Sequence, residues 1–213
     1  MQHIIFDMDG VLINSEPLIM HAAQTALAEY GITATRKDFE PFLGAGEEKF
    51  IISPAAQAGK SEDIPAICER MYRLYEERAA KELIVYPSAL PLLRQLKERE
   101  ILTALASSSA RRKLMVSLEA AGIAQDLFRV ILSGSDVKEK KPSPEIYLTA
   151  AQKLGAHPQD CLVIEDALSG ITAAKAAGMQ CFAVTTSFEK KQLKQAGADI
   201  IADDIIRLLD LIF

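Results

Sequence analysis

The chain alternates short apolar runs with amphipathic segments at its beginning and again after residue 86. The first run, His3–Phe6, is too short for a helix and predicts a strand. After residue 86, apolar residues spaced three and four positions apart predict helices, and short apolar runs between them predict strands. The predicted segments, in chain order, are a helix around Leu92–Leu96, strand Ile101–Ala106, helix Arg112–Ala121, strand Val130–Leu132, helix Glu145–Leu154, strand Cys161–Ile164, helix Ile171–Ala177, strand Cys181–Val184 and strand Asp199–Ala202.

Strands that alternate with helices are typical of an α/β fold, in which a parallel sheet is covered by helices on both faces. The predicted strands are apolar along nearly their whole length, as expected when both faces of a sheet are buried. The pattern therefore predicts the α/β class with a parallel sheet.

Residues 15–86 have a different pattern, with helical spacing and no convincing strand. A first helix carries apolar residues from Leu18 to Leu27 and can end at Gly31. Further helical stretches are predicted around Arg36–Leu43, Glu47–Ala58 and Ile64–Tyr75, with a break at residues 44–46. We therefore predict a core of residues 1–14 and 87–213 and an inserted, all-helical cap of residues 15–86. The two connections, near residues 14–15 and 86–87, are placed to form a hinge.

Composition narrows the possible partners. The chain has 213 residues, a net charge of −5 and a pI near 5.3, which suit an acidic globular protein. It has no basic run, so nucleic acid is not an expected partner. No apolar stretch is long enough to span a bilayer, so no membrane partner is expected. The first strand begins too early for a signal peptide, and the three scattered cysteines suit neither a disulfide framework nor a zinc site, so a cytoplasmic location is expected.

Two carboxylates follow the first predicted strand. Strand side chains repeat every two residues, so Asp7 and Asp9 begin on the same side. Like charges this close repel each other, and a bound cation, a shared proton or a division of labour between nucleophile and acid/base would offset the repulsion. An exposed acidic turn is the alternative, because Asp and Gly10 are common turn residues.

Polar residues also follow the later strands, where open α/β sheets bind ligands. Ser107–Ser109 precede a helix whose first N–H groups would attract an anion, although plain N-capping is an alternative. Lys141 lies just before a helix start marked by Ser143-Pro144. Glu165 and Asp166 again place two carboxylates after an apolar strand, and such oxygen ligands suit Mg²⁺.

Taken together, these residues resemble motifs of the haloacid dehalogenase superfamily, in the subgroup with a helical cap after the first motif. The matching segments are Asp7-Met8-Asp9-Gly10-Val11-Leu12, Ser107, Lys141-Pro142-Ser143-Pro144-Glu145-Ile146-Tyr147, and Val163-Ile164-Glu165-Asp166-Ala167 with Gly170. They span nearly the whole chain in the family's order. The branch that the chain resembles most contains sugar-phosphate phosphatases and β-phosphoglucomutases. The resemblance implies a Rossmann-like core with a helical cap.

The resemblance also implies residue roles. Asp7 would be the nucleophile that forms an aspartyl-phosphate, and Asp9 the general acid and base. That role requires a raised or switchable pKa of Asp9, for which a like-charged neighbour is one source. The metal would be Mg²⁺, held by side chains of Asp7 and Asp166 and the backbone carbonyl of Asp9, with Glu165 acting indirectly or through water. Ser107, the Ser108 backbone and Lys141 would bind phosphoryl oxygens.

Several activities are compatible with these motifs. We expect a Mg²⁺-dependent phosphatase that hydrolyses a small phosphorylated metabolite, such as a sugar or polyol phosphate. A β-phosphoglucomutase is the alternative, but the cap arginine expected to hold its second phosphate is replaced by Glu47, and its Lys-Asn pair by Ala110-Arg111; Lys49 or Arg111 could substitute. Phosphonate hydrolysis would need a buried cap lysine. A non-catalytic protein that binds a phosphorylated metabolite would have lost Asp7, Asp9, Lys141 or Asp166, and all four are present.

The leaving group is expected to contact the cap. The candidate substrate residues there are Glu16, His21, Glu47 and Lys49, within a set that includes residues 44–49 and Tyr75. An enclosed cap of this kind is expected to accompany a monomer.

Overall fold

The computed structural model describes residues 3–43 and 46–212. Six parallel strands form the main sheet, in the spatial order β5-β4-β1-β6-β7-β8. The strands are β1 (His3–Phe6), β4 (Thr103–Ala106), β5 (Val130–Leu132), β6 (Cys161–Glu165), β7 (Gln180–Val184) and β8 (Ile200–Ala202). The predicted α/β class is confirmed. The predicted break at residues 44–46 falls partly on residues 44 and 45, which lie outside the described residues.

The order of the strands locates the ligand side of the sheet. The chain runs from β1 to β4 and β5 on one side and returns to β6, β7 and β8 on the other. In such a sheet, ligands bind at the carboxyl ends of the strands where the order reverses. Phe6 at the end of β1 pairs with Leu105 of β4 and Ile164 of β6. The residues that follow these three strands therefore meet at one edge.

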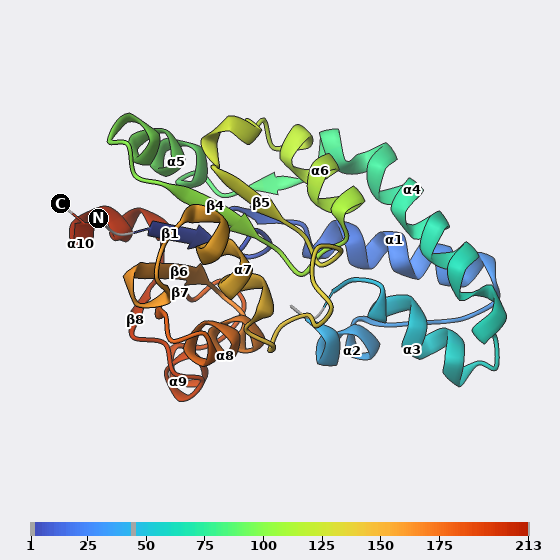
Figure 1. The fold of residues 1–213 in the computed structure, drawn as a ribbon. Helices are drawn as coiled ribbons and strands as arrows, with labels where there is room; N and C mark the ends of the chain where they lie inside the picture. The colour runs from blue at the N-terminus through green and yellow to red at the C-terminus, as the bar shows by residue number, and fades with distance from the viewer. Residues whose placement is uncertain (1–2, 44–45, 213) are drawn as a thin grey trace.

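Helices cover both faces of the sheet (Figure 1). One face packs against α5 (Ala89–Glu98), α6 (Arg111–Ala120) and the last segment, a 3₁₀ turn Ile205–Leu208 followed by α10 (Leu209–Ile212). The other packs against α7 (Glu145–Leu154), α8 (Leu168–Ala176) and α9 (Lys190–Gln195). Successive residues of a strand point to opposite faces of the sheet. In β1, Ile4 and Phe6 therefore pack against the first group of helices and Ile5 against the second.

Among the described residues, the four α-helices that precede α5 form a separate apolar cluster, and we call them the cap. They are α1 (Glu16–Glu29), α2 (Arg36–Phe39), α3 (Lys49–Gln57) and α4 (Ile64–Glu82). Their buried side chains include Leu27, Phe39, Ile51, Met71 and Tyr75. The predicted stretch Arg36–Leu43 is divided into α2 and a 3₁₀ turn, because Pro41 has no N–H to continue the helix.

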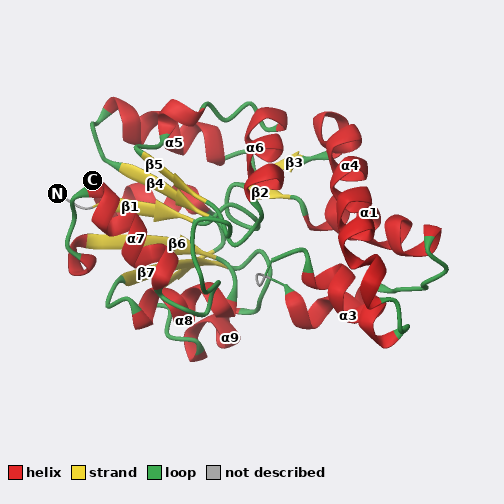
Figure 2. Cartoon of the chain, turned by 45° about the vertical axis from the view of Figure 1, so that its right-hand side comes forward, coloured by secondary structure: helices red, strands yellow, loops and turns green. Residues whose placement is uncertain are grey.

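Two short strands join the cap to the sheet. β2 (Ile13–Asn14) and β3 (Ile84–Val85) pair antiparallel, and Figure 2 shows them side by side between the sheet and the cap helices. The sequence did not predict them, because two residues are too few to show alternation. The two cap connections are therefore bonded to each other.

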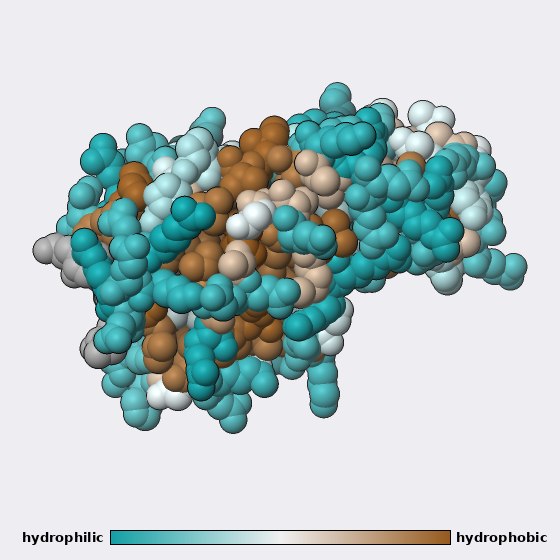
Figure 3. All heavy atoms as spheres, turned by 90° about the horizontal axis from the view of Figure 1, so that it is seen from above, coloured by the Kyte–Doolittle hydropathy of each residue, from teal (hydrophilic) through white to brown (hydrophobic). Residues whose placement is uncertain are grey.

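One face of the molecule shows how polar and apolar residues are distributed over the cap and the sheet. In Figure 3 the cap end of this face is largely hydrophilic, and apolar residues gather toward the middle and over the sheet end. Among the described residues, no helix combines the length and apolar character needed to cross a bilayer.

Candidate active site

A cleft of about 280 Å³ lies between the carboxyl edge of the sheet and the cap. Its residues come from segments far apart in the sequence. The sheet side includes Asp7, Asp9, Ser107–Ser109 and Asp166, and the cap side includes Glu16, Arg36, Phe42, Glu47 and Phe50. Asp7 continues the ladder of β1, because its N–H donates to the carbonyl of Ile164 at 2.9 Å. The strand ends thus bring together the core residues that the sequence predicted.

Three carboxylates line the floor of the cleft, and the buried Lys141 contacts two of them. Asp7, Glu165 and Asp166 each place an oxygen within 4.8 Å of the others. The Lys141 Nζ lies 2.5 Å from Asp7 Oδ1 and 2.9 Å from Glu165 Oε1, and donates to the carbonyl of Ala106 at 3.0 Å. The lysine is 3% exposed and Asp7 7%. One ammonium opposes three carboxylates, so the ionised cluster retains an excess of negative charge.

Burial and the excess negative charge change the ionisation of the cluster. Burial raises the pKa of Asp7 to about 7, against the opposing effect of Lys141. Burial and the charge of Glu165 raise the pKa of Asp166 well above its ordinary value. Burial alone would lower the pKa of Lys141, but the carboxylates of Asp7 and Glu165 raise it. A cation bound here would relieve the repulsion between the carboxylates.

The donor set fits Mg²⁺, which prefers carboxylate oxygens. Both oxygens of Glu165 already accept hydrogen bonds within the chain. Oε1 accepts from Lys141 and Tyr147, and Oε2 accepts from the backbone N–H groups of Asp166 and Ala167. Asp7 and Asp166 are therefore the more available ligands.

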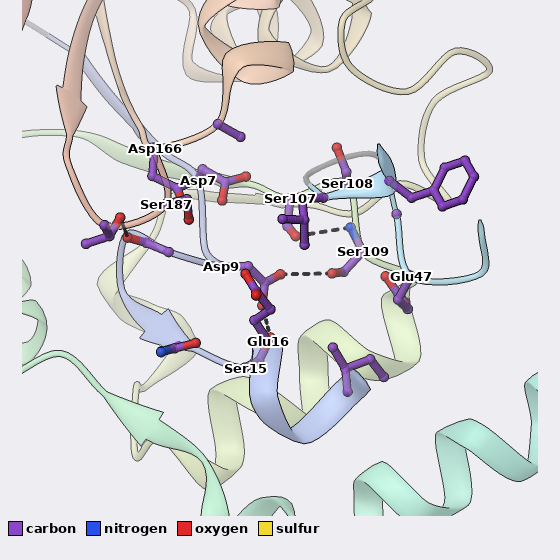
Figure 4. Close-up of a pocket in the computed structure, with 18 of the residues that line it drawn as sticks. Asp7, Asp9, Ser15, Glu16, Glu47, Ser107, Ser108, Ser109, Asp166 and Ser187 are labelled. Carbon is purple, nitrogen blue, oxygen red and sulfur yellow. Dashed lines mark hydrogen bonds between the residues drawn. The ribbon is translucent and has the colours of Figure 1, made fainter. Parts of the chain in front are cut away.

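Gly10 leaves space for Asp166. A Cβ on Gly10 would lie 1.8 Å from Asp166 Oδ2, and Gly10 has a φ of +83°. Only glycine adopts this conformation readily and lets the carboxylate approach the backbone so closely. Asp166 also accepts a hydrogen bond from Ser187 (Figure 4).

The serine loop precedes α6. Ser107 Oγ accepts from the backbone N–H of Ser109 at 3.1 Å. Ser108 Oγ is buried and has no hydrogen-bond partner among the described residues, although Ser108 lines the cleft. No serine caps α6, whose N-cap is Ala110. The alternative that a serine caps α6 is therefore wrong. The buried Ser108 hydroxyl remains available to a ligand.

Asp9 lies apart from the carboxylate cluster and points toward Ser15 and Ser109 (Figure 4). Its Oδ1 accepts from Lys113 Nζ at 2.7 Å and from Ser15 Oγ, and its Oδ2 accepts from Ser109 Oγ at 2.9 Å. Burial acts to raise the pKa of Asp9, but Lys113 and the hydrogen bonds outweigh it and lower the pKa. In the structure the buried ammonium of Lys113, rather than the neighbouring Asp7, thus dominates the charge beside Asp9, and the pKa is lowered and not raised.

The cap brings two of its four predicted residues to the cleft. Glu47 is buried, and its Oε1 accepts from Tyr72 Oη and from the N–H of Ala110, both at 3.0 Å. Glu16 lines the cleft and pairs with Arg36 at 2.7 Å.

The other predicted cap residues do not line the cleft. His21 and Lys49 are exposed, and neither is among the cleft residues. His21 lies on the outer face of α1, whose opposite face packs into the cap. Tyr75 is buried in the cap cluster, where its hydroxyl lies 2.7 Å from Ser117 Oγ.

Sequence reasoning missed Lys113, Ser15, Arg36 and Ser187. Lys113 belongs to the run Arg111-Arg112-Lys113, which resembles an exposed basic turn of helix. Its helical phase was an available signal, because Lys113 lies one turn before the buried Ser117. The other three depend on loop and cap packing that shows no sequence period.

Comparisons with known proteins give matches over most of the chain. A family model described as haloacid dehalogenase-like hydrolase matches residues 4–184. The chain is 42% identical to Protein SUPPRESSOR OF QUENCHING 1, chloroplastic, of Arabidopsis thaliana over 205 residues. The aligned region covers 95% of this chain and 19% of that protein. The chain thus spans about a fifth of that relative. It is 30% identical to the Phosphorylated carbohydrates phosphatase of Thermotoga maritima, covering 93% of this chain and 92% of that protein. The solved structure of a β-phosphoglucomutase from Clostridium difficile has a TM-score of 0.83 and 26% identity, covering 98% of this chain and 93% of that one.

Proposed function

Since this chain belongs to the haloacid dehalogenase-like hydrolase family, we propose that it is a Mg²⁺-dependent phosphatase acting on a small metabolite with one phosphate group. The predicted family and enzyme class are confirmed; the metal and the substrate are the proposal. One observation carries it: Asp7 and Asp166 lie together in the cleft floor, with Lys141 bonded to Asp7, and Asp9 lies on a separate wall.

In the proposed reaction, Asp7 is the nucleophile. One of its carboxylate oxygens attacks phosphorus, and the bond from phosphorus to the ester oxygen breaks. A proton from Asp9 passes to the leaving oxygen, which departs as an alcohol, and Asp7 carries the phosphoryl group. In the second step Asp9 takes a proton from water while the water oxygen attacks phosphorus. Phosphate is released and the Asp7 carboxylate is restored.

The two steps need different protonation states of Asp9. Its lowered pKa favours the carboxylate, which is the form that accepts a proton from water. A bound phosphate dianion brings additional negative charge and favours the protonated form, which the first step needs. Substrate binding itself would thus switch Asp9.

Asp7 and Asp166 would hold Mg²⁺, which when bound supplies positive charge that stabilises the phosphoryl oxygens. Lys141 would contribute a second positive charge at the same position, because its Nζ is held beside Asp7. Ser107 and Ser108 would donate to the remaining phosphoryl oxygens, and the unpartnered Ser108 hydroxyl supports this role. Fixed donors aimed at a transferring phosphoryl group are usually a large contribution to catalysis.

The charges around the cleft support a neutral leaving group. Among the described residues that line it, the two cations are Arg36, paired with Glu16, and Lys113, paired with Asp9. Glu47 adds negative charge on the cap side. Residues 44 and 45 are Gly and Ala and bring no charged side chain. A second phosphate or a carboxylate would have no free cation here, whereas a sugar or polyol would not need one.

The same observation disfavours the mutase alternative. A phosphomutase must hold a second phosphate away from its nucleophile, and Glu47 would repel one. The name of the Thermotoga maritima relative, a phosphatase of phosphorylated carbohydrates, also favours hydrolysis. The mutase nevertheless remains a defined outcome of the test, because a β-phosphoglucomutase has the same fold.

The test is phosphate release from sugar, polyol and nucleotide monophosphates, with Mg²⁺ and with EDTA, and with Asp7→Asn as the control. We expect Mg²⁺-dependent release from a few sugar or polyol phosphates and none from the variant. Conversion of β-glucose 1-phosphate to glucose 6-phosphate with a bisphosphate primer, without release, would instead establish the mutase. Release no greater than that of Asp7→Asn, and no conversion, would leave a non-catalytic binding protein.

A further inference from the structure

Lys113 is buried between the core and the cap. It lies in the first turn of α6 and is 3% exposed. Its Nζ lies 2.7 Å from Asp9 Oδ1 and 3.1 Å from Ser109 Oγ, and 5.6 Å from the ring centre of Tyr75. None of the sequence motifs that identify the family in this chain includes Lys113. A buried ammonium is unfavourable without a partner, so its position depends on the Asp9 carboxylate.

Three donors from different segments hold the Asp9 carboxylate. Lys113 and Ser15 both donate to Oδ1, and Ser109 donates to Oδ2. Only Lys113 among the three carries a charge, and charge-assisted hydrogen bonds are the stronger kind. It also donates to Ser109 and thus joins two of the contacts. Lys113 therefore has the largest influence on where the Asp9 oxygens lie.

We propose that Lys113 is a positioning residue, which holds the Asp9 carboxylate at the cleft wall in the one orientation from which it exchanges protons with the leaving oxygen and with water. The inference rests on the proposed function, because it assigns a reason for the geometry of the acid/base group. Lys113 itself need not contact substrate.

Loss of a residue that positions Asp9 affects different leaving groups unequally, whereas loss of a purely structural residue does not. In the first step the Asp7–phosphorus bond forms, the phosphorus–oxygen ester bond breaks, and the Asp9 proton goes to the leaving oxygen. A sugar or polyol oxygen needs that proton, because an alkoxide leaves poorly. A nitrophenolate is a stable anion and leaves without it. Displacing Asp9 should therefore slow the sugar or polyol phosphate far more than p-nitrophenyl phosphate.

The experiment compares kcat/KM for these two substrates, because this constant includes the first step. In Lys113→Met, we expect the ratio of sugar-phosphate to p-nitrophenyl-phosphate kcat/KM to fall by roughly 10- to 100-fold, a part of the 10²- to 10⁴-fold that proton transfer typically contributes. Asp9→Asn should lower the same ratio, and the double variant should lower it little beyond Asp9→Asn alone, because the two residues act as a unit.

The matched control is Lys97→Met. Lys97 pairs with Asp126 at the same 2.7 Å, but the two side chains are 50% and 72% exposed and lie outside the cleft. The Lys97→Met variant should therefore have the same ratio of the two kcat/KM values as the wild type. If Lys113→Met does not fold, Lys113→Gln keeps a polar group in the site and should still lower the ratio. A partly unfolded sample lowers both rate constants equally and leaves the ratio unchanged.

An unchanged ratio in both Lys113 variants, with phosphate release intact in the wild type, overturns the inference and leaves the proposed function standing. A wild type that releases no more phosphate than Asp7→Asn from either substrate overturns both.

Discussion

The Oε1 atom of Glu47, in the cap, lies 3.0 Å from the backbone nitrogen of Ala110, the N-cap of α6 in the core. The same atom accepts from the Tyr72 hydroxyl of α4. The start of a helix attracts negative charge, because its first N–H groups have no partner within the helix. A cap carboxylate therefore occupies this helix start, next to the serine loop, and links the cap to the core.

We expect Glu47→Ala to lower the free energy of unfolding by about 1–3 kcal/mol, because it leaves the Tyr72 hydroxyl and the Ala110 N–H without their buried partner. Urea titration measures the loss. Glu48→Ala is the matched control, since Glu48 is more exposed and its contacts to Tyr72 and Lys140 are 3.4 and 3.5 Å. Its loss should stay below about 1 kcal/mol. Equal losses in the two variants would show that the Glu47 contacts do not stabilise the chain.

The raised pKa of Asp7 predicts a pH-dependent stability of the metal-free chain. The pKa is about 7 in the folded state and 3.8 ordinarily, so between these values the folded state holds a proton that the unfolded state has released. Stability from this group is therefore complete below about pH 4 and is lost as the pH rises through about 7. In EDTA, the free energy of unfolding of the wild type should fall by a few kcal/mol between pH 4 and 7 relative to that of Asp7→Asn. The slope for one proton is about 1.4 kcal/mol per pH unit. A constant difference between the two proteins across this range would contradict the assignment.

Mg²⁺ should stabilise the folded chain through the carboxylate cluster. At a concentration 100 times its Kd, a ligand that binds only the folded state adds about 2.7 kcal/mol. Asp166→Asn should remove most of this gain, because Asp166 belongs to the cluster. Asp9→Asn should keep it, because the Asp9 side chain bonds to Lys113, Ser15 and Ser109 instead. Thermal unfolding with and without Mg²⁺ distinguishes the two; a loss in Asp9→Asn as large as in Asp166→Asn would place the Asp9 side chain on the metal.

Gly10→Ala should damage the site more than its backbone conformation alone explains. The added Cβ would lie 1.8 Å from Asp166 Oδ2, so the carboxylate must move. Gly59→Ala provides the control, because Gly59 also has a positive φ, +70°, but nothing lies within 4 Å of its Cβ. Both variants should lose roughly 1–2 kcal/mol of stability from the backbone. Only Gly10→Ala should also lose Mg²⁺-dependent stabilisation, and retention of it would show that Asp166 can adjust.

The core part of the site could be predicted because it follows from the strands. Once β1, β4 and β6 are recognised as parallel neighbours, Asp7, Ser107 and Glu165 must meet at their ends. The cap part could not be predicted in this way. Whether Glu16 or His21 faces the cleft depends on how α1 packs, and the two lie only five positions apart on one helix. The lowered pKa of Asp9 could not be predicted for a related reason, since its partner Lys113 comes from a helix about a hundred residues away.

The pairing of β2 with β3 restricts how the cap can move. Ile13 pairs with Val85 and Asn14 with Ile84, and the N–H of Tyr86 donates to the carbonyl of Leu12 at 3.1 Å. Sliding or separation of the two connections would break these bonds, whereas a rotation about the ladder keeps them. An opening of the cap that preserves the ladder is therefore a hinge rotation. Admission of substrate and the return of Glu47 to Ala110 would be opposite directions of that rotation.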